Sequence, residues 1–160
     1  WWAEHDGVPS FAGERWSSHS WDKNNKVEAA ARWELNLVEG RHGRGFSVNP
    51  QFINYGENSG FQAINLAILF GAKTVLLVGF NMRGTHFFGR HGHMLRNSDP
   101  TLFIKNFNMA ARPDLMPPGI KIVNCTPDSA LQCFPYVPLA DALRDLTPVC
   151  GMDTLPVPIT

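Results

Sequence analysis

The hydrophobic positions between residues 61 and 70 predict a buried helix. Apolar side chains occupy almost every position of this stretch and go nearly all the way round a helical projection. The exceptions are Gln62 and Asn65, which lie three positions apart and share one polar strip. A helix with so narrow a polar strip is expected to be covered on most sides.

The boundaries of this helix are marked in the sequence. Asn58 or Ser59 can cap its N-terminus by accepting hydrogen bonds from backbone N–H groups two or three residues further on. Gly71 stands where a residue in the left-handed conformation would end it. We therefore predict a helix from Gly60 to about Phe70.

A continuous β-rich run, Thr74–Val78, follows the helix without polar alternation. Such a run is typical of a strand covered on both faces of a parallel sheet. The next helix is expected from Ser98 to about Ala111, since Asp99-Pro100 supplies a cap and a proline at the first helical position, and a second buried strand follows at Ile120–Asn124.

The order strand, helix, strand predicts an α/β fold, namely a Rossmann-like three-layer sandwich with a mostly parallel sheet. We expect Thr74–Phe80 to be its central strand and Ile120–Asn124 to be the neighbouring strand, joined to it by a right-handed crossover. Thr126 and Pro127 are expected to begin a short helix through Leu131. Residues 1–146 are predicted to form one domain, and residues 147–160 a proline-rich tail.

The N-terminal part predicts shorter elements. A short strand is expected around Arg15–Ser17, and Arg32–Val38 alternates apolar and polar residues like a half-buried strand near a sheet edge. Glu39–Gly45 reads as a flexible basic loop with three glycines, and Pro138–Leu146 as an amphipathic last helix. Because the chain opens on Trp1 rather than Met, we expect a first strand and its loop to precede it.

The best candidate ligand site lies at the start of the first helix. Free N–H groups and the positive end of the helix dipole attract anions there, and ligands of open parallel sheets bind beyond the carboxyl ends of the strands. A well-capped helix without a ligand is the alternative. The predicted binding residues occupy this helix start and the ends of the two buried strands: Asn58, Ser59, Gly60, Gly79, Asn81, Asn124, Thr126 and Ser129.

The segment Thr85–His93 concentrates three histidines beside arginine and aromatic residues. An imidazole titrates near neutral pH, so His86, which lies nearest the end of the Val75–Gly79 strand, is the predicted catalytic acid or base. A zinc site made by His86, His91 and His93 is a second interpretation, and a surface loop without a function is a third.

Several motifs of the sequence resemble those of a known protein family. Its pattern NSGFQAINLAILFGAKTVLLVGFN, followed by THFFG and later by NCTPDSAL and FP, is similar to small phage and prophage proteins of uncharacterised function. These resemble, more distantly, the Rossmann-like group of the family 42 bacterial sialyltransferases and the MptE-like pyrophosphokinases. The resemblance covers roughly residues 54–146.

The resemblance implies a nucleotide-linked donor or a pyrophosphate as ligand. It favours a glycosyltransferase-like or nucleotidyl- or pyrophosphoryl-transfer domain in the cytoplasm of a phage-infected or lysogenic bacterial cell, with a nucleotide sugar or nucleotide as donor and Mg²⁺ as an optional cofactor. Asn81 stands where the wider group often has an acidic residue, and an amide neither acts as a base nor binds a metal like a carboxylate. An inactive phage structural, assembly or host-interaction module on the same fold is therefore the alternative.

Composition narrows the choice of partners. The formal net charge is zero, so no general attraction to nucleic acid is expected, although Arg83, Arg90 and Arg96 could hold one anionic small molecule. The longest apolar run is far shorter than the roughly 20 residues of a membrane span. Three cysteines without CxxC spacing suggest reduced thiols. The tryptophan-rich first 25 residues suggest core packing or a homo-oligomer contact, with stacking on a carbohydrate or a base as the alternative.

Overall fold

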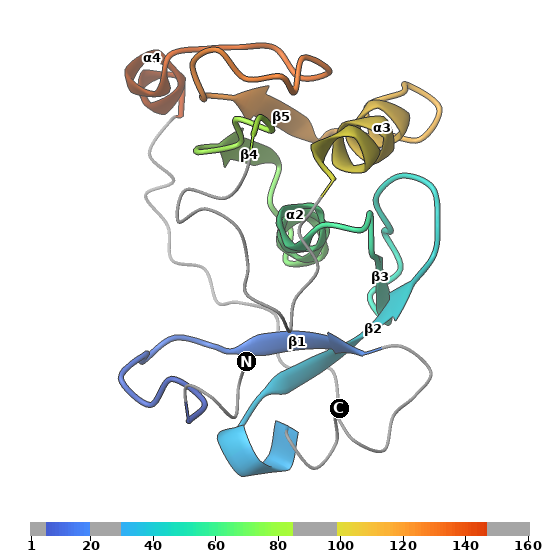
Figure 1. Ribbon diagram of the computed structural model, residues 1–160, viewed down its shortest axis with the longest axis vertical. Coiled ribbons are helices and arrows are strands. Elements are labelled where there is room, and N and C mark those ends of the chain that lie inside the picture. The colour runs from blue at the N-terminus through green and yellow to red at the C-terminus, as the bar shows by residue number, and fades with distance from the viewer. Residues whose placement is uncertain (1–5, 20–29, 85–98, 147–160) are drawn as a thin grey trace.

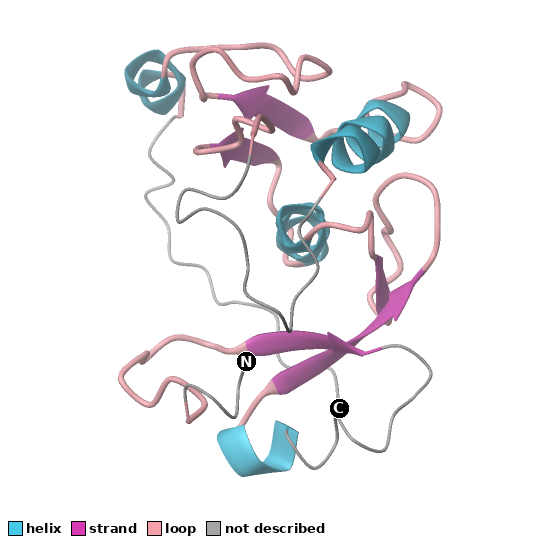
Figure 2. Ribbon diagram, in the orientation of Figure 1, coloured by secondary structure: helices cyan, strands magenta, loops and turns pink. Residues whose placement is uncertain are grey.

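The computed structural model describes residues 6–19, 30–84 and 99–146, and these form helices and parallel strands (Figures 1 and 2). In chain order the elements are β1 (Trp16–His19), β2 (Asn36–Arg41), β3 (Phe52–Asn54), α2 (Ser59–Leu69), β4 (Thr74–Leu77), α3 (Pro100–Ala110), β5 (Lys121–Asn124) and α4 (Leu139–Arg144).

The described strands form two sheets, and every pairing within them is parallel. One sheet has the order β1-β2-β3, with Trp16 opposite Asn36 and Glu39 opposite Phe52. The other consists of β4 and β5, with Leu77 opposite Asn124. The predicted α/β class and the parallel pairing of the two buried strands, with a helix between them in sequence, are confirmed. The single continuous sheet was not found among these residues.

Helix α2 lies between the two sheets and connects them (Figure 1). Four residues separate β3 from α2, and four separate α2 from β4. Phe61, Ile64 and Ile68 on α2 pack in one core with Leu77 of β4. The connection β3-α2-β4 thus has the order of a crossover unit, although its two strands belong to different sheets.

Both ends of α2 follow the prediction closely. The side chain of Asn58 caps the helix, because its Oδ1 accepts a hydrogen bond from the backbone N–H of Phe61 at 3.0 Å. At the other end Gly71 adopts φ +91°, its N–H donates to the carbonyl of Ile68, and the N–H of Ala72 donates to the carbonyl of Ala67. This pair of bonds is a Schellman motif, which requires a left-handed residue at the glycine position.

The core is built around aromatic rings. Phe61 on α2 and Phe107 on α3 are 1% and 0% exposed, and their ring centroids lie 5.3 Å apart. Phe46 stacks on Phe61 at 4.5 Å, and Phe134 meets Phe107 edge-on at 6.2 Å. Each fully buried phenylalanine contributes roughly 1.5–3 kcal/mol, so this cluster is what joins α2, α3 and the β4-β5 sheet.

The two residues of the polar strip on α2 have different surroundings. Gln62 is half-buried and accepts a hydrogen bond from the hydroxyl of Ser18, whereas Asn65 is 0% exposed. Meanwhile Ala63 and Phe70 are exposed, so the helix is buried along one face and is not covered on nearly all sides as predicted. Apolar residues on a short helix do not all find a covering layer.

The predicted strand Arg32–Val38 is wrong at its start. Residues 30–33 are helical, Glu34 adopts φ +52°, and β2 runs from Asn36 to Arg41. The ring of Trp33 packs on Gly7, where an added Cβ would lie 2.4 Å from it, so its side chain is placed by the N-terminal segment and not by a strand. Glu39–Arg41 therefore belong to a strand instead of a loop, and β2 is the middle strand of its sheet instead of an edge strand.

Two further predictions are corrected. The run Thr74–Val78 is not covered on both faces, because Thr74 to Leu76 are half-buried and Val78 is 58% exposed. Residues 125–131 form a turn and no helix, because Thr126 bonds across to the loop after β4.

The remaining elements agree with their predictions more closely. Strand β1 overlaps the expected short strand around Arg15–Ser17, α3 is capped by Asp99, and α4 lies within the expected last helix. Trp16 packs edge-on against Phe70 with ring centroids 5.1 Å apart, in line with the packing role expected for tryptophan. None of the helices in the part of the chain described here is long and apolar enough to cross a membrane.

Candidate functional site

The loops after β4 and β5 are fastened to each other at the carboxyl ends of these strands. The backbone N–H of Phe80 donates to the hydroxyl of Thr126 at 2.9 Å, and the hydroxyl of Ser129 donates to the carbonyl of Phe80. The N–H of Ala130 donates to the carbonyl of Asn81 at 2.9 Å. The structure therefore brings the predicted residues Gly79 to Asn81 and Asn124 to Ser129 to one place.

Several side chains that were predicted to bind a ligand here form hydrogen bonds with the backbone of these loops instead. Oδ1 of Asn124 accepts from the N–H of Thr126 at 3.0 Å, and its Nδ2 donates to the carbonyl of Leu131 at 2.9 Å. Asn124 is 2% exposed and Thr126 is 9% exposed. The hydroxyl of Ser129 also accepts from the N–H of Leu131. These side chains shape the loops, while Gly79 and Asn81 are the exposed members of the set.

The N-terminus of α2 lies against this pair of loops. The ring of Phe80 packs on Gly60, where an added Cβ would be 2.8 Å from Cζ of the ring. Asn58 uses its side chain for the cap, and Ser59 is exposed at the first helical position. The carboxyl ends of β3 and β4, which belong to different sheets, thus both lead to the same helix end.

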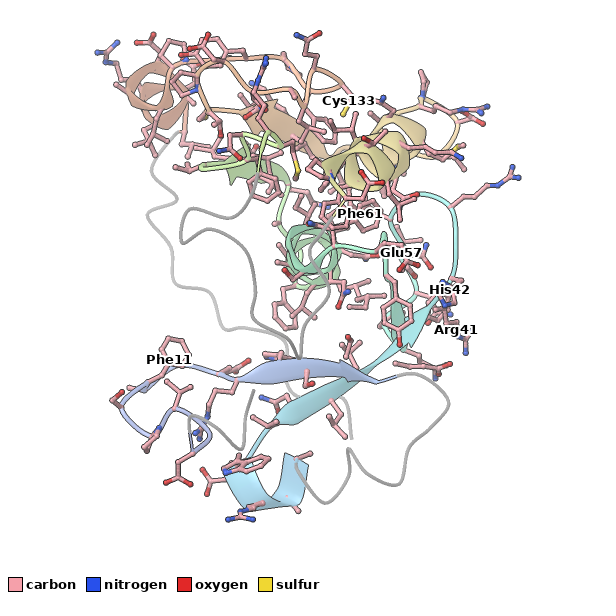
Figure 3. The ribbon with its side chains drawn as sticks, in the orientation of Figure 1. Phe11, Arg41, His42, Glu57, Phe61 and Cys133 are labelled. Atoms are coloured by element: carbon pink, nitrogen blue, oxygen red, sulfur yellow. The ribbon has the colours of Figure 1, made fainter. Side chains whose placement is uncertain are left out.

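A residue pair that the sequence did not suggest lies on the other side of this helix end. Nδ1 of His42, just after β2, is 3.3 Å from Oε1 of Glu57, which immediately precedes the cap residue Asn58. The ring of His42 also meets Tyr55 edge-on, with centroids 5.3 Å apart. Figure 3 shows His42 and Glu57 beside the ends of β2 and β3. The pair thus connects the loop after β2 to the predicted ligand loop.

The backbone of that ligand loop is held in an uncommon conformation. Gly56 and Glu57 both have positive φ, +53° and +56°. The carbonyl of Gly56 accepts a hydrogen bond from Nδ2 of Asn106 on α3 at 2.9 Å. A positive φ at a glutamate costs roughly 1 kcal/mol or more, so the surrounding contacts must determine it. The consequence is that the carboxylate of Glu57 is presented to His42.

Glycines explain why the sequence pattern hid this pair. An added Cβ at Gly40 would lie 2.1 Å from the ring of Tyr55, and one at Gly43 would lie 2.2 Å from Oδ1 of Asn54. These glycines allow β3 and its loop to lie close to β2, whereas the sequence alone presents them as marks of a flexible loop. The sequence would have indicated that His42 and Glu57 lie together only if the pairing of β2 with β3 had been predicted.

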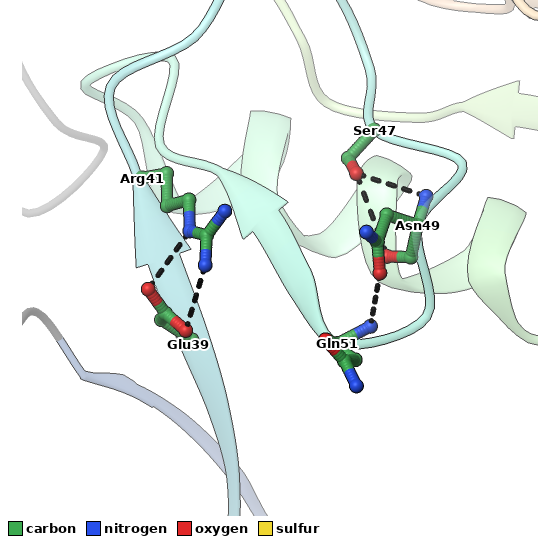
Figure 4. Close-up of polar contacts among 5 residues, drawn as sticks. All are labelled: Glu39, Arg41, Ser47, Asn49 and Gln51. Atoms are coloured by element: carbon green, nitrogen blue, oxygen red, sulfur yellow. Dashed lines mark hydrogen bonds and ion pairs between the residues drawn. The ribbon is translucent and has the colours of Figure 1, made fainter.

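Arg41 is paired with a carboxylate and lies over an aromatic ring. It forms two hydrogen bonds with the carboxylate of Glu39, at 2.8 and 3.2 Å, and its guanidinium lies 4.1 Å from the ring centroid of Phe52 (Figure 4). The hydrogen bond with Glu39 raises the pKa of Arg41. The same figure shows Ser47, Asn49 and Gln51 joined by side chain to backbone bonds, which shape the turn before β3.

The predicted histidine site lies outside the described residues. This applies to His86, His91 and His93 and to Arg90 and Arg96, so the catalytic and the zinc interpretation both stay predictions. Arg83 is described, and its Nε donates to the carbonyl of Asp128 at 2.8 Å. Within residues 6–19, 30–84 and 99–146, no group of three or more His, Cys, Asp or Glu side chains is placed to hold a metal ion.

A hollow of about 460 Å³ lies along one face of α3 and contains none of the predicted site residues. It is lined by Thr101, Ile104, Lys105, Asn108, Met109 and Arg112. All of these belong to one helix and the turn after it. A single convex helix does not enclose a small ligand, so the strand ends around α2 are the better candidate site.

The described residues form an α/β domain with parallel sheets, in which the loops after β3 and β4 meet at the N-terminus of α2. Comparison of the chain with protein-family models, with curated proteins and with solved structures found no match.

Proposed function

We propose that this chain is the Rossmann-like domain of a transferase that binds a nucleotide-linked small molecule at the N-terminus of α2. The reaction is glycosyl transfer or nucleotidyl or pyrophosphoryl transfer. The observation that carries this proposal is the convergence of two strand ends on one helix end, with Phe80 from the loop after β4 packed on Gly60. The proposed setting is the cytoplasm of a phage-infected or lysogenic cell, and the proposed assembly a homo-oligomer formed through the tryptophan-rich N-terminal segment.

The polarity of this helix end suits a phosphate. The first turn of α2 carries no acidic side chain, and its first backbone N–H groups are those of Ser59 and Gly60. Backbone N–H groups and the helix dipole both favour an anion at this position. The exposed Asn81 and Gly79 lie at the end of β4, where an amide and a bare backbone suit a sugar or a base.

A second candidate is an inactive binding or assembly module on the same fold. It is favoured by the use of Asn124, Thr126 and Ser129 as structural groups, which leaves fewer side chains for a ligand. Asn81, an amide where related sites carry a carboxylate, favours it as well.

Ligand binding separates the two candidates. We would follow thermal unfolding with CMP, UDP, GDP, ATP and sugar nucleotides, with and without Mg²⁺, and measure nucleotide release chromatographically. A ligand at 100 times its Kd stabilises the native state by roughly 2.7 kcal/mol, so a true ligand raises the melting temperature with its concentration. A transferase also releases the nucleotide, or pyrophosphate in nucleotidyl transfer, whereas the inactive module releases neither.

A charge at the helix end tests the site itself. Ser59→Asp places a carboxylate at the first helical position. The helix dipole stabilises this charge, but the charge repels a bound phosphate. The matched control is Thr101→Asp in the first turn of α3, which introduces the same charge at another exposed helix start. We expect the ligand-induced shift to disappear in Ser59→Asp and to persist in Thr101→Asp. Loss in both variants, or in neither, would contradict this location.

A further inference from the structure

The pairing of His42 with Glu57 fixes which nitrogen of the imidazole faces outward. Nδ1 lies 3.3 Å from Oε1 of Glu57, within ion-pair distance, so Nδ1 is the nitrogen that faces the carboxylate. Nε2 is the other nitrogen of the ring. His42 has 79% of its side chain exposed, so Nε2 can be reached by a bound molecule.

The surroundings of His42 orient its ring. Glu57 holds one edge, and Tyr55 contacts the ring at a centroid distance of 5.3 Å. The backbone at Tyr55 is itself paired with β2, since its N–H donates to the carbonyl of Arg41 at 2.9 Å. The carboxylate of Glu39 bonds to Arg41, so this nearby arginine is already matched by an anion. An imidazole oriented by a carboxylate beside an anion-binding helix end is an arrangement suited to proton transfer.

We infer that His42 is the proton-transferring residue of the proposed transferase and that Glu57 is its positioning residue. This inference rests on the proposed function and assigns a role at the same helix end. Nε2 of His42 takes the proton from a hydroxyl of the acceptor as the acceptor oxygen forms a bond to the anomeric carbon or the phosphorus of the donor. The bond from that atom to the leaving phosphate oxygen breaks. Its electron pair departs with the nucleotide in glycosyl or pyrophosphoryl transfer and with pyrophosphate in nucleotidyl transfer. Glu57 stabilises the imidazolium that forms.

The tests use whichever nucleotide-linked donor of the panel above the full chain turns over. His42→Ala should lower kcat roughly 10²- to 10⁴-fold and leave the donor-induced thermal shift unchanged. Added imidazole should restore part of the rate that His42→Ala loses. It would restore nothing if the substitution had only damaged the structure.

The role of Glu57 is tested by non-additivity. Glu57→Gln should lower kcat with little change in KM, and it should lower the rate no further once His42 is already alanine. Asp114→Asn is the matched control, since it removes the carboxylate of another exposed pair, Arg112 with Asp114, and should leave the rate unchanged.

The outcomes separate this inference from the function on which it rests. If the wild-type chain binds and turns over a donor while His42→Ala keeps its kcat, the role of His42 is wrong and the proposed function stands. The same conclusion holds if imidazole restores nothing, or if Glu57→Gln and His42→Ala act additively. If the wild-type chain neither binds nor turns over any donor of the panel, the proposed function and the inference are both overturned.

Discussion

Asn65 and Ser47 exchange two hydrogen bonds in the core. Oδ1 of Asn65 accepts from the N–H of Ser47, and Nδ2 donates to its carbonyl, both at 2.9 Å. The same Oδ1 also accepts from the N–H of Asn54 at 3.0 Å. A single buried amide on α2 thus satisfies three backbone groups before and at the end of β3. Because unsatisfied buried groups are costly, the placement of β3 against α2 depends on this side chain.

We therefore predict that Asn65→Ala strongly destabilises the protein. Each backbone group that loses its partner costs about 1–3 kcal/mol, so the total loss should be several kcal/mol by urea unfolding. Asn108→Ala is the control, because Asn108 is exposed on α3 and the change is chemically the same. Equal midpoints for the two variants would show that the buried amide does not hold these segments.

This asparagine shows how far sequence reasoning reached into the fold. The periodicity placed Asn65 on a polar strip correctly, but periodicity gives only the direction of a side chain from its helix. Whether a segment covers that direction depends on contacts distant in sequence, here residues 47 and 54. The caps of α2 and α3 were predictable because they depend on neighbouring residues alone. The β1-β2-β3 sheet was not, since its middle strand follows a helical turn whose position depends on Trp33 packing on Gly7.

A second prediction concerns Gly56, whose φ is +53°. An added Cβ would lie 2.2 Å from Cγ of Phe61, which is 1% exposed. Gly56→Ala should therefore cost roughly 1 kcal/mol for the left-handed backbone and roughly 1–3 kcal/mol more for the overlap with the ring. Gly119→Ala separates the two effects, because Gly119 has φ +75° and nothing within 4 Å of an added Cβ. If both substitutions cost the same in chemical denaturation, the ring contact does not limit the loop.

The third prediction concerns the hydroxyl of Thr126, which accepts from the N–H of Phe80. Thr126→Val removes this acceptor and should cost about 1 kcal/mol or more in thermal or urea unfolding, whereas Thr126→Ser keeps it. If the hydroxyl serves the loop and not the ligand, both variants should retain the donor-induced thermal shift. If Thr126→Val keeps the stability of the wild type but loses the donor-induced thermal shift, Thr126 belongs to the ligand site.

The candidate site shows a similar division between what the sequence revealed and what it hid. Strand ends could be identified as a meeting place, so Gly79, Asn81 and the residues after β5 were found together. The sequence did not reveal that Asn124 and Thr126 form hydrogen bonds with the backbone. A polar residue type alone does not show whether its side chain binds a ligand or a loop. His42 and Glu57 are fifteen positions apart and are brought together only by the parallel pairing of β2 with β3.

A fourth prediction concerns the reactivity of Cys133. Burial raises the pKa of the Cys133 thiol from its ordinary 9.0 to about 11. The thiolate is the reactive form, so at pH 8 Cys133 should be alkylated by iodoacetamide roughly 100-fold more slowly than an exposed thiol. Peptide mass spectrometry of the folded and the urea-unfolded chain measures this. Equal rates in the two states would contradict the burial of the thiol.

The same shift gives stability a direction with pH. The folded pKa of Cys133 lies above the unfolded value, so on raising the pH the unfolded chain loses this proton first. The stabilisation is fully present below about pH 9 and is lost as the pH rises through about 11. Other groups titrate in this range, so the measurement is the difference in urea midpoints between wild type and Cys133→Ala at pH 8 and pH 11. We expect the wild type to lose more stability than the variant over this interval, and a parallel decline of the two proteins would show that the thiol ionises equally easily in the folded chain.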